Sequence, residues 1–315
     1  MSYYAKIVAD SIAFGTRLTT VEVCYPRFIL AEDNTHRVFS RNSASSRAIP
    51  IERRIEQVLK NPFVPAAFAK NKAGMSADEV LDELANEEAA KDWLTARDAC
   101  VEAARSLAAR GVHKQYANRL LELWSWHTVI KTATEWTNFD NLRDHPAAQP
   151  EMQLAARCTK KARAENTPRE LDVGEWHLPY VEQADNVMQS EKPLLVNGEP
   201  VGRVTWHATE IADRLAISVA RCAAISFERQ YAEKTVEQYI ARHDDLLQSR
   251  HLSPFEHQAQ VVEPFANPFV AEPPFSSHYR REKDYWVLTG HFCGNFAAPW
   301  LQYRKQLPGE AVFTG

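Results

Sequence analysis

A short segment near the N-terminus is dense in side chains that bind anions. Residues 35 to 47, THRVFSRNSASSR, contain three arginines, a histidine, an asparagine and four serines. A guanidinium group offers a planar fork to phosphate oxygens, and hydroxyl, amide and backbone N–H groups add neutral donors. Because the segment follows a predicted strand, a phosphate-binding turn is one interpretation. A solvated, serine-rich turn that could be modified is the other, and the pattern alone gives the two equal weight.

Two further clusters combine titratable and polar residues. The stretch His251 to His257, HLSPFEH, holds two histidines and a glutamate, but its spacing matches no common zinc pattern. Ordinary loop histidines are therefore favoured there, and no metal site is expected. The stretch from Thr134 to Met152 carries Arg143 where a predicted helix leads into a polar turn. Taken alone, Arg143 indicates a surface arginine.

Several kinds of site find no support in the sequence. There is no G-x-S-x-G elbow and, with 10 glycines in the chain, neither phosphate-binding glycine fingerprint occurs. The five cysteines are an odd number, lie far apart and form no CxxC pair. Disulfides, thiolate zinc sites, Rossmann sites and covalent catalysis are thus not expected.

Hydrophobic periodicity predicts the elements that must position these clusters. Alternation of apolar residues predicts strands at 5–9 and 17–25, and an apolar run predicts another at 285–292. Helical spacing predicts helices at 76–111, 113–124, 150–165, 208–227 and 232–250. The turn-rich stretches 166–201 and 263–277 separate them. The predicted fold class is α+β with helices dominant.

Length and charge narrow the class of protein. The 315 residues suggest two domains or one large one, and a net charge of −4 gives no global basic field for DNA. No apolar run approaches the roughly 18 residues of a membrane helix, and the first residues lack a signal-peptide layout. A cytoplasmic protein that does not act on membranes is expected.

The three clusters together resemble the flavin-dependent thymidylate synthases (ThyX). The first signature of that family is R-H-R followed by S-x-N-E-x-S-x-R. Residues 35–37, Thr-His-Arg, stand for R-H-R, and the positions matching the rest are Ser40, Asn42, Ser45 and Arg47. Two positions depart from the signature, because Thr35 replaces its first Arg and Ser43 replaces its Glu.

Later parts of the chain resemble the other signatures of the family. An N-F-x-N-L-R-x5-Q-x-E run looks like residues 138–151, with Asn138, Arg143, Gln149 and Glu151 in place, and Arg119 is similar to an upstream Ala-Arg. The family's N-terminal signature, S-F and then H-x-T/S-P-F-E-H, resembles residues 226–227 and 251–257 but comes last here. The order is therefore permuted, as in divergent phage-type members.

Residues 302–310, QYRKQLPGE, resemble a second, degenerate copy of the R-H-R segment. Arg304 and Glu310 stand at the spacing of its last Arg and its Glu, so Glu310 is expected to replace the carboxylate missing at Ser43. The resemblance implies a ThyX-like antiparallel or mixed sheet with a dominant helical layer, circularly permuted or pseudo-duplicated. Its parts would be 1–165, a linker or long loop at 166–205, and 206–315.

The resemblance also implies the reaction: reductive methylation of dUMP at C5, with FAD as carrier and NADPH and methylenetetrahydrofolate as co-substrates. By match, the catalytic residues are Ser45, Arg47 and Arg143. The substrate-binding residues are Ser45, Arg47, Arg119, Arg143, Gln302, Arg304 and Glu310. The flavin-binding residues are His36, Arg37, Ser40, Asn42, Asn138, Ser226, His251 and Ser253.

Two alternatives stay open because of the changes at Thr35 and Ser43. One is a C5 hydroxymethylase or methylase of dUMP or dCMP on the same scaffold. The other is a non-catalytic paralogue that binds flavin, nucleotide or, through Arg41, Arg47 and Arg53, nucleic acid. In the main interpretation the chain is a homo-oligomer that binds a pyrimidine deoxynucleotide and no nucleic acid, in the host cytoplasm if phage-encoded.

Overall fold

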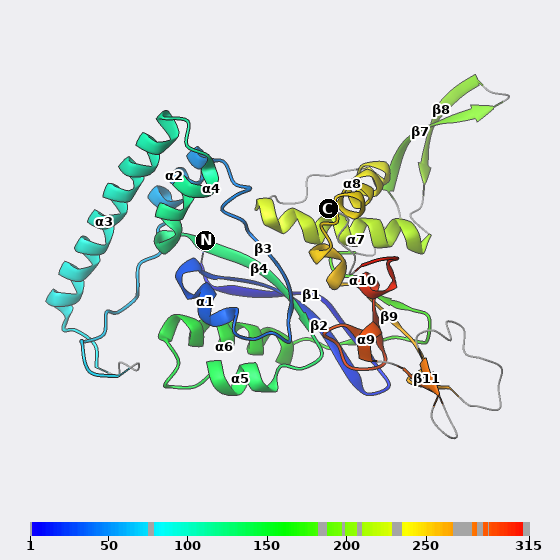
Figure 1. Ribbon diagram of the computed structural model, residues 1–315, viewed down its shortest axis with the longest axis horizontal. Coiled ribbons are helices and arrows are strands. Elements are labelled where there is room, and N and C mark those ends of the chain that lie inside the picture. The colour runs from blue at the N-terminus through cyan, green and yellow to red at the C-terminus, as the bar shows by residue number, and fades with distance from the viewer. Residues whose placement is uncertain are drawn as a thin grey trace.

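The computed structural model describes residues 2–74, 79–181, 188–196, 199–206, 210–228, 235–266, 279–281, 286–288 and 290–310. Helices and mostly antiparallel sheets both contribute, so the α+β expectation is confirmed (Figure 1). The ThyX-like character of the fold and its permutation stay predictions. In the part of the chain that is described, no helix is both long and apolar enough to cross a membrane.

The central sheet has five strands in the order β3-β4-β2-β1-β5. They are β1 (Tyr4–Ala13), β2 (Thr16–Pro26), β3 (Ser40–Ser43), β4 (Trp126–Ala133) and β5 (Arg169–Glu170). All neighbours pair antiparallel except β1 and β5. The β1–β2 hairpin turns at Phe14 and Gly15, which both have positive φ. The strands predicted at 5–9 and 17–25 are confirmed.

Helices cover both faces of this sheet (Figure 1). On one face, Val21, Val23 and Val129 pack against Met152 of α6 (Pro150–Ala164), beside α5 (Thr137–Arg143). On the other face, Ile130 packs with Cys222 of α7 (Ile211–Ala224). Because side chains alternate along a strand, Val129 and its neighbour Ile130 serve opposite layers of the core. The helices predicted at 150–165 and 208–227 are confirmed.

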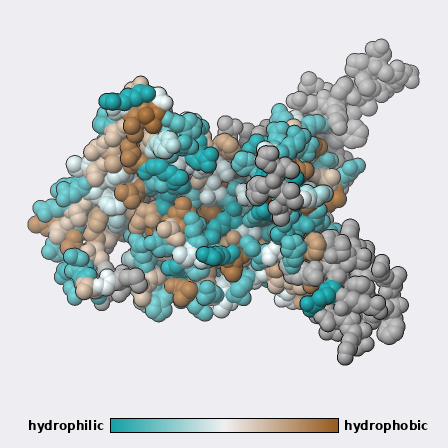
Figure 2. Space-filling model, in the orientation of Figure 1, coloured by the Kyte–Doolittle hydropathy of each residue, from teal (hydrophilic) through white to brown (hydrophobic). Residues whose placement is uncertain are grey.

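A helical arm follows the segment at residues 35–47. It comprises α2 (Ile51–Lys60), α3 (Glu83–Ala109), α4 (Lys114–Ala117) and the 3-10 helix η2 (Asn118–Trp124). The helix predicted from Ser76 begins at Glu83 instead, because the Asp82 carboxylate caps it by accepting a hydrogen bond from the Ala85 N–H. Ser76 itself lies outside the described residues. Figure 2 shows apolar side chains at the surface of this arm, where Leu59, Leu84, Tyr116, Leu120 and Leu123 are exposed.

The remaining elements lie at the end of the central sheet that is away from the helical arm (Figure 1). A second sheet has the order β13-β9-β6, from β6 (Trp176–His177), β9 (Ala259–Val261) and β13 (Trp300–Gln302). The other elements there are η4 (Ile225–Phe227), α8 (Val236–Gln248), η5 (Ser253–Glu256) and α10 (Tyr303–Gln306). The helix predicted at 232–250 is thus confirmed as α8.

Two predicted irregular or extended segments differ from the structure. The stretch 166–205, expected as a linker, contains β5, β6 and the hairpin of β7 (Met188–Val196) and β8 (Glu199–Trp206). The strand predicted at 285–292 is wrong in its second half. β12 (Trp286–Leu288) pairs with β10 (Phe265–Ala266) and β11 (Tyr279–Arg281), and a short helix, α9 (Gly290–Cys293), follows. The apolar run thus divides between a strand and a helix.

Short elements carry the chain from β2 to β3. They are the 3-10 helix η1 (Arg27–Ile29) and α1 (Leu30–Asp33), which contact each other and place the segment at residues 35–47 beside β4. The segment is therefore split between a turn in which His36 and Phe39 are buried and Arg37 is exposed, the strand β3 and a loop that leads into α2. Each part has different surroundings.

Candidate functional site

A cavity of about 450 Å³ lies between the loop after β3 and the ends of α7, α8 and η5. Six of the predicted site residues line it: Asn42, Ser45, Arg47, Ser226, His251 and Ser253. The first three come from the N-terminal part of the chain and the other three from the C-terminal part. The structure thus brings the two ends of the sequence pattern to one place, at a volume typical of ligand sites.

The charge of this cavity is positive. Arg47, Lys114 and Arg242 contribute to its lining, together with four serines, and no carboxylate does. Arg47 and Arg242 have no ion-pair partner among the described residues, and the Lys114 ammonium donates to the Ala48 carbonyl at 3.1 Å. Unpaired cations grouped with hydroxyl donors favour an anionic ligand.

Side-chain and backbone hydrogen bonds join the two walls of the cavity. The Asn42 side chain donates to the Cys222 carbonyl at 2.6 Å and accepts from the Ser226 hydroxyl at 3.3 Å. The Ser45 N–H donates to the Ser226 carbonyl at 3.0 Å. Asn42 and Ser226 therefore connect β3 to the end of α7 as well as lining the cavity.

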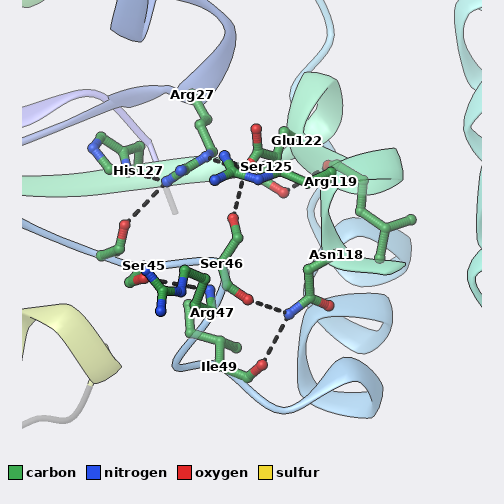
Figure 3. A network of polar contacts seen from close by, with 12 residues as sticks. Arg27, Ser45, Ser46, Arg47, Ile49, Asn118, Arg119, Glu122, Ser125 and His127 are labelled. Carbon is green, nitrogen blue, oxygen red and sulfur yellow. Dashed lines mark hydrogen bonds and ion pairs between the residues drawn. The ribbon is translucent and has the colours of Figure 1, made fainter. Parts of the chain in front are cut away.

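A buried network holds the loop at residues 44–49 from behind (Figure 3). Arg27 donates to the Ala44 carbonyl at 3.0 Å and to Nδ1 of His127 at 2.8 Å, and it pairs with Glu122 at 2.9 Å. The Asn118 amide donates to the carbonyls of Ser46 and Ile49 at 2.8 and 2.9 Å. Burial and the Arg27 charge lower the pKa of His127, so its ring is neutral and Nδ1 accepts. The loop is held before any ligand arrives.

Arg143 and His36 meet on the other side of β3. The Arg143 Nε donates to His36 Nε2 at 2.8 Å, and its Nη2 donates to the Thr35 hydroxyl at 2.9 Å. Burial, together with the Arg143 charge, lowers the pKa of His36 to about 4, which keeps the ring neutral. Thr35, one of the two departures from the family signature, therefore accepts a hydrogen bond from Arg143.

A buried ion cluster lies beneath this turn. The Lys131 ammonium pairs with Asp33, and both side chains are at most 1% exposed. Tyr25 donates to Asp33 at 2.9 Å, Arg41 lies 3.6 Å from it, and the ring of Phe139 is 4.8 Å from the Lys131 Nζ. The cations hold the pKa of Asp33 below its usual value despite burial. Every charge here has a partner, so the cluster stabilises the fold.

The remaining predicted residues lie outside the cavity lining. Arg37 and Asn138 are exposed, and Arg119 is exposed and paired with Glu122 at 2.9 Å. The Gln302 amide donates to the Ser40 hydroxyl at 3.2 Å and to the Glu256 carbonyl at 3.0 Å. Arg37, Asn138 and Arg119 therefore lie at the surface, and the Gln302 and Ser40 side chains bond to each other.

Glu310, expected to replace the carboxylate missing at Ser43, is engaged elsewhere. It accepts from Arg304 at 3.0 Å and from Lys305 at 2.6 Å, and Arg304 also pairs with Glu256. These cations hold the pKa of Glu310 below its usual value, although burial opposes them. Neither Glu310 nor Arg304 lines the cavity.

Other cavities contain fewer of the residues matched to the family signatures. One of about 380 Å³ beside α2 and β4 is lined by Arg54, Gln57, Trp124 and Trp126, among others, and contains no predicted site residue. Gln149 and Glu151, matched to the family signature, line another of about 380 Å³ with Trp93. No cluster of three or more metal-ligating side chains is found within the described ranges.

Three polar residues of the cavity lining were not found from the sequence: Lys114, Arg242 and Ser249. Lys114 is the first residue of a short helix, and Arg242 lies in the middle of α8. Charged residues are common on the solvent-facing sides of helices. Nothing in the sequence therefore distinguishes Lys114 and Arg242 from the charged residues near them. Their role depends on where α4 and α8 pack.

The sequence matches no protein-family model and no curated protein. It is similar in structure to the UMP/dUMP methylase PolB from Streptomyces cacaoi bound with 5-Br dUMP, with 19% identity and a TM-score of 0.40. That likeness covers 47% of this chain and 66% of the other, so the chain spans less than two thirds of that relative's length. A second PolB structure, bound with 5-Br UMP, gives 17% identity and a TM-score of 0.44 over 52% of this chain and 89% of the other.

Proposed function

We propose that this chain is a flavin-dependent enzyme of the thymidylate synthase type, which methylates dUMP reductively at C5. The observation that carries the proposal is the cavity that gathers Asn42, Ser45 and Arg47 with Ser226, His251 and Ser253. All six match positions of the family signatures, and they come from two parts of the chain that lie about 180 residues or more apart in the sequence. Chance would not be expected to collect them around one acid-free cavity.

The cavity suits a phosphate-bearing cofactor such as FAD. Lys114 and Arg242 offer charge, and the serine hydroxyls offer neutral donors, to the phosphates of a dinucleotide. Asn42, Ser226, His251 and Ser253 are the residues that would hold the flavin. FAD, when bound, would supply the electron-carrying ring, with NADPH as reductant and methylenetetrahydrofolate as carbon donor.

Arg47 and Ser45 are the residues proposed to bind the phosphate of the pyrimidine nucleotide. The Ser45 hydroxyl accepts from the Arg47 backbone N–H at 3.3 Å, which places both in one turn at the cavity. The exposed Arg47 guanidinium has no carboxylate to displace, so it can pair with phosphate at no cost of a broken ion pair. These groups orient the nucleotide and exclude competing poses.

The surroundings of the cysteines agree with a reaction that requires no protein nucleophile. No cysteine lines the cavity. Burial raises the pKa of the Cys24 thiol to about 12 and that of Cys293 to about 11, and it raises the pKa of Cys222 further. The attacking species in cysteine catalysis is the thiolate, which these three residues do not form near neutral pH. Catalysis would rest on positioning and on polarisation of the base.

A homo-oligomer is part of the proposal. The apolar side chains exposed on the helical arm, including Leu120 and Leu123, are the kind of surface that a subunit contact covers. In an oligomer, a second copy of the chain would also bring its Arg37 or Asn138, which are exposed here, toward the site of the first. Sedimentation of the purified protein at several concentrations tests this part separately.

The first test is an absorbance spectrum from about 300 to 550 nm with added FAD, followed by NADPH with and without dUMP. We expect flavin bands that bleach faster with dUMP, and dTMP as product when methylenetetrahydrofolate is present. Product analysis on dUMP and dCMP separates methylation from hydroxymethylation. A protein that takes up no FAD but binds DNA in a salt-dependent manner would overturn the proposal in favour of a binding paralogue.

A further inference from the structure

Glu228 has an unusual backbone conformation directly beside the cavity. It ends η4 with φ of 48° and ψ of 35°, the left-handed region that side chains other than glycine rarely adopt. Its carboxylate is nevertheless buried, with 3% of the side chain exposed. A strained backbone and a buried charge at one residue require strong compensating contacts.

Helix α2 supplies these contacts from three positions on one side. Arg54, whose side chain is also 3% exposed, pairs with the Glu228 carboxylate at 3.1 Å, and the Gln57 amide donates to it at 2.7 Å. The Arg53 guanidinium donates to the Glu228 backbone carbonyl at 2.8 Å. Both the side chain and the main chain of Glu228 are therefore fixed to α2.

The two elements joined by Glu228 are the ones that carry the opposite walls of the cavity. Helix α2 continues directly from the loop with Ser45 and Arg47, and the Arg54 N–H donates to the Pro50 carbonyl at 3.1 Å. Ser226 stands two residues before Glu228. Its carbonyl accepts from the Ser45 N–H at 3.0 Å and its hydroxyl reaches Asn42 at 3.3 Å. These bonds join the walls directly, and the contacts of Glu228 with α2 fix the backbone of the same turn from the other side.

We propose that Glu228 is a positioning residue that sets the separation of the two cavity walls through Arg54 and Gln57. It touches no ligand, since it does not line the cavity. It acts by fixing Ser226 against the loop at 45–48, so that both walls meet one ligand at the same time. The inference rests on the proposed function of the cavity as a cofactor and nucleotide site.

Glu228→Gln removes the charge that pairs with Arg54 and keeps the size of the side chain. The folded variant should bind FAD at least tenfold more weakly than the parent, because the walls are no longer held at one separation. The Ser45 amide, which donates to the Ser226 carbonyl, should exchange its hydrogen faster. FAD fluorescence titration and hydrogen exchange measure the two effects on the intact chain.

A double variant and a control separate positioning from stability. In Arg54→Leu with Glu228→Leu, no buried charge is left unpaired, so the melting temperature should recover while FAD affinity stays low. Asp140→Asn breaks the ion pair between Asp140 and Arg163 on the other face of the sheet. These side chains are 17% and 13% exposed, so the pair is less buried than that of Glu228 and Arg54. This control should lose stability and keep its FAD affinity within twofold.

Two results would count against the inference. If Glu228→Gln lowers the melting temperature but binds FAD within twofold of the parent, the residue is merely structural. If Ser45 exchange is unchanged in a folded variant, the walls do not depend on Glu228. A parent protein that binds no FAD would instead defeat the proposed function, and Ser45 exchange would still decide the role of Glu228.

Discussion

The two halves of the segment at residues 35–47 have opposite surroundings. In the first half, His36 and Arg41 turn into the interior and bind Arg143 and Asp33. In the second half, Ser45 and Arg47 line the cavity, where Arg47 has no ion-pair partner within the described part of the chain. The same residue types therefore serve the fold where they are partnered and remain available to a ligand where they are not.

The contrast extends to the residues that other elements contribute. Around the first half, Lys131 is fully buried and paired with Asp33, and Arg41 faces the same carboxylate at 3.6 Å. Around the second half, Lys114 and Arg242 add positive charge with no carboxylate in the lining. In the first region a protein carboxylate balances buried cations. In the second region the cations are not buried, and an anionic ligand would supply the negative charge.

The largest expected effect is the loss of stability in acid. Burial lowers the pKa of His177 and His257 to about 3, and burial with Arg143 lowers that of His36 to about 4, against 6.5 in the unfolded chain. Between pH 6.5 and 4 the unfolded state therefore binds more protons, and the free energy of unfolding falls as pH falls. Each histidine contributes a slope of roughly 1.4 kcal/mol per pH unit. Urea denaturation from pH 8 to 4 measures this, and a flat profile below pH 6.5 would contradict it.

Lys131→Met tests the partnered half. It leaves Asp33 buried without its cation, which typically costs about 3–5 kcal/mol of unfolding free energy. Adding Asp33→Asn should recover part of that loss. The fraction of Lys131→Met that stays folded should keep its affinity for FAD, as measured by titration, and a loss of affinity in that fraction would break the distinction between the two halves.

Arg47→Ala tests the open half. Loss of a charge-assisted contact of about 2–5 kcal/mol lowers turnover roughly 30- to 3000-fold. Stability should change little because the side chain is exposed. Arg37→Ala is the matched control, since Arg37 is an exposed arginine of the same segment outside the cavity lining. Equal losses in steady-state assays of both variants would show that the site extends beyond this cavity.

Arg242→Gln and Lys114→Gln test the cations that the structure adds. Each should weaken binding of FAD about tenfold, or 1.4 kcal/mol, and should reduce its salt dependence. Titrations at two ionic strengths measure both effects. Arg250→Gln is the control, because Arg250 follows α8 but contacts the Pro308 and Gly309 carbonyls. Loss of salt dependence in the control alone would place the anion elsewhere.

The smallest effect is expected in the first half, at His36. Arg143→Ala removes the cation that bonds His36 Nε2, so the pKa of His36 should rise from about 4 while burial keeps it below 6.5. NMR titration of the histidine ring follows this directly. An unchanged pKa would mean that Arg143 does not hold His36 in solution. Turnover of the same variant tests the catalytic role that the resemblance assigns to Arg143.

Helices and strands could be predicted from the sequence better than contacts between residues that lie far apart in it. Strands at 5–9 and 17–25 and the helix at 150–165 were found because apolar periodicity reports which faces are buried. The positions in the cavity from Asn42 to Ser253 followed from motif resemblance. Arg242 could not be predicted as a cavity residue, because the way α8 packs decides which residues face it. The engagement of Arg143 by His36 and Thr35 depends likewise on contacts between distant segments.

The bond between Ser226 and Asn42 spans 184 residues of sequence. A ribosome makes the first wall of the cavity long before the second, so a growing chain holds Ser45 and Arg47 without the residues that complete their surroundings. If the cavity binds the proposed ligand, binding competence arises only after η5 has been made. Protection by the ligand would then distinguish finished molecules from truncated ones, since a chain interrupted after β5 would contain every strand of the central sheet and lack Ser226, His251 and Ser253.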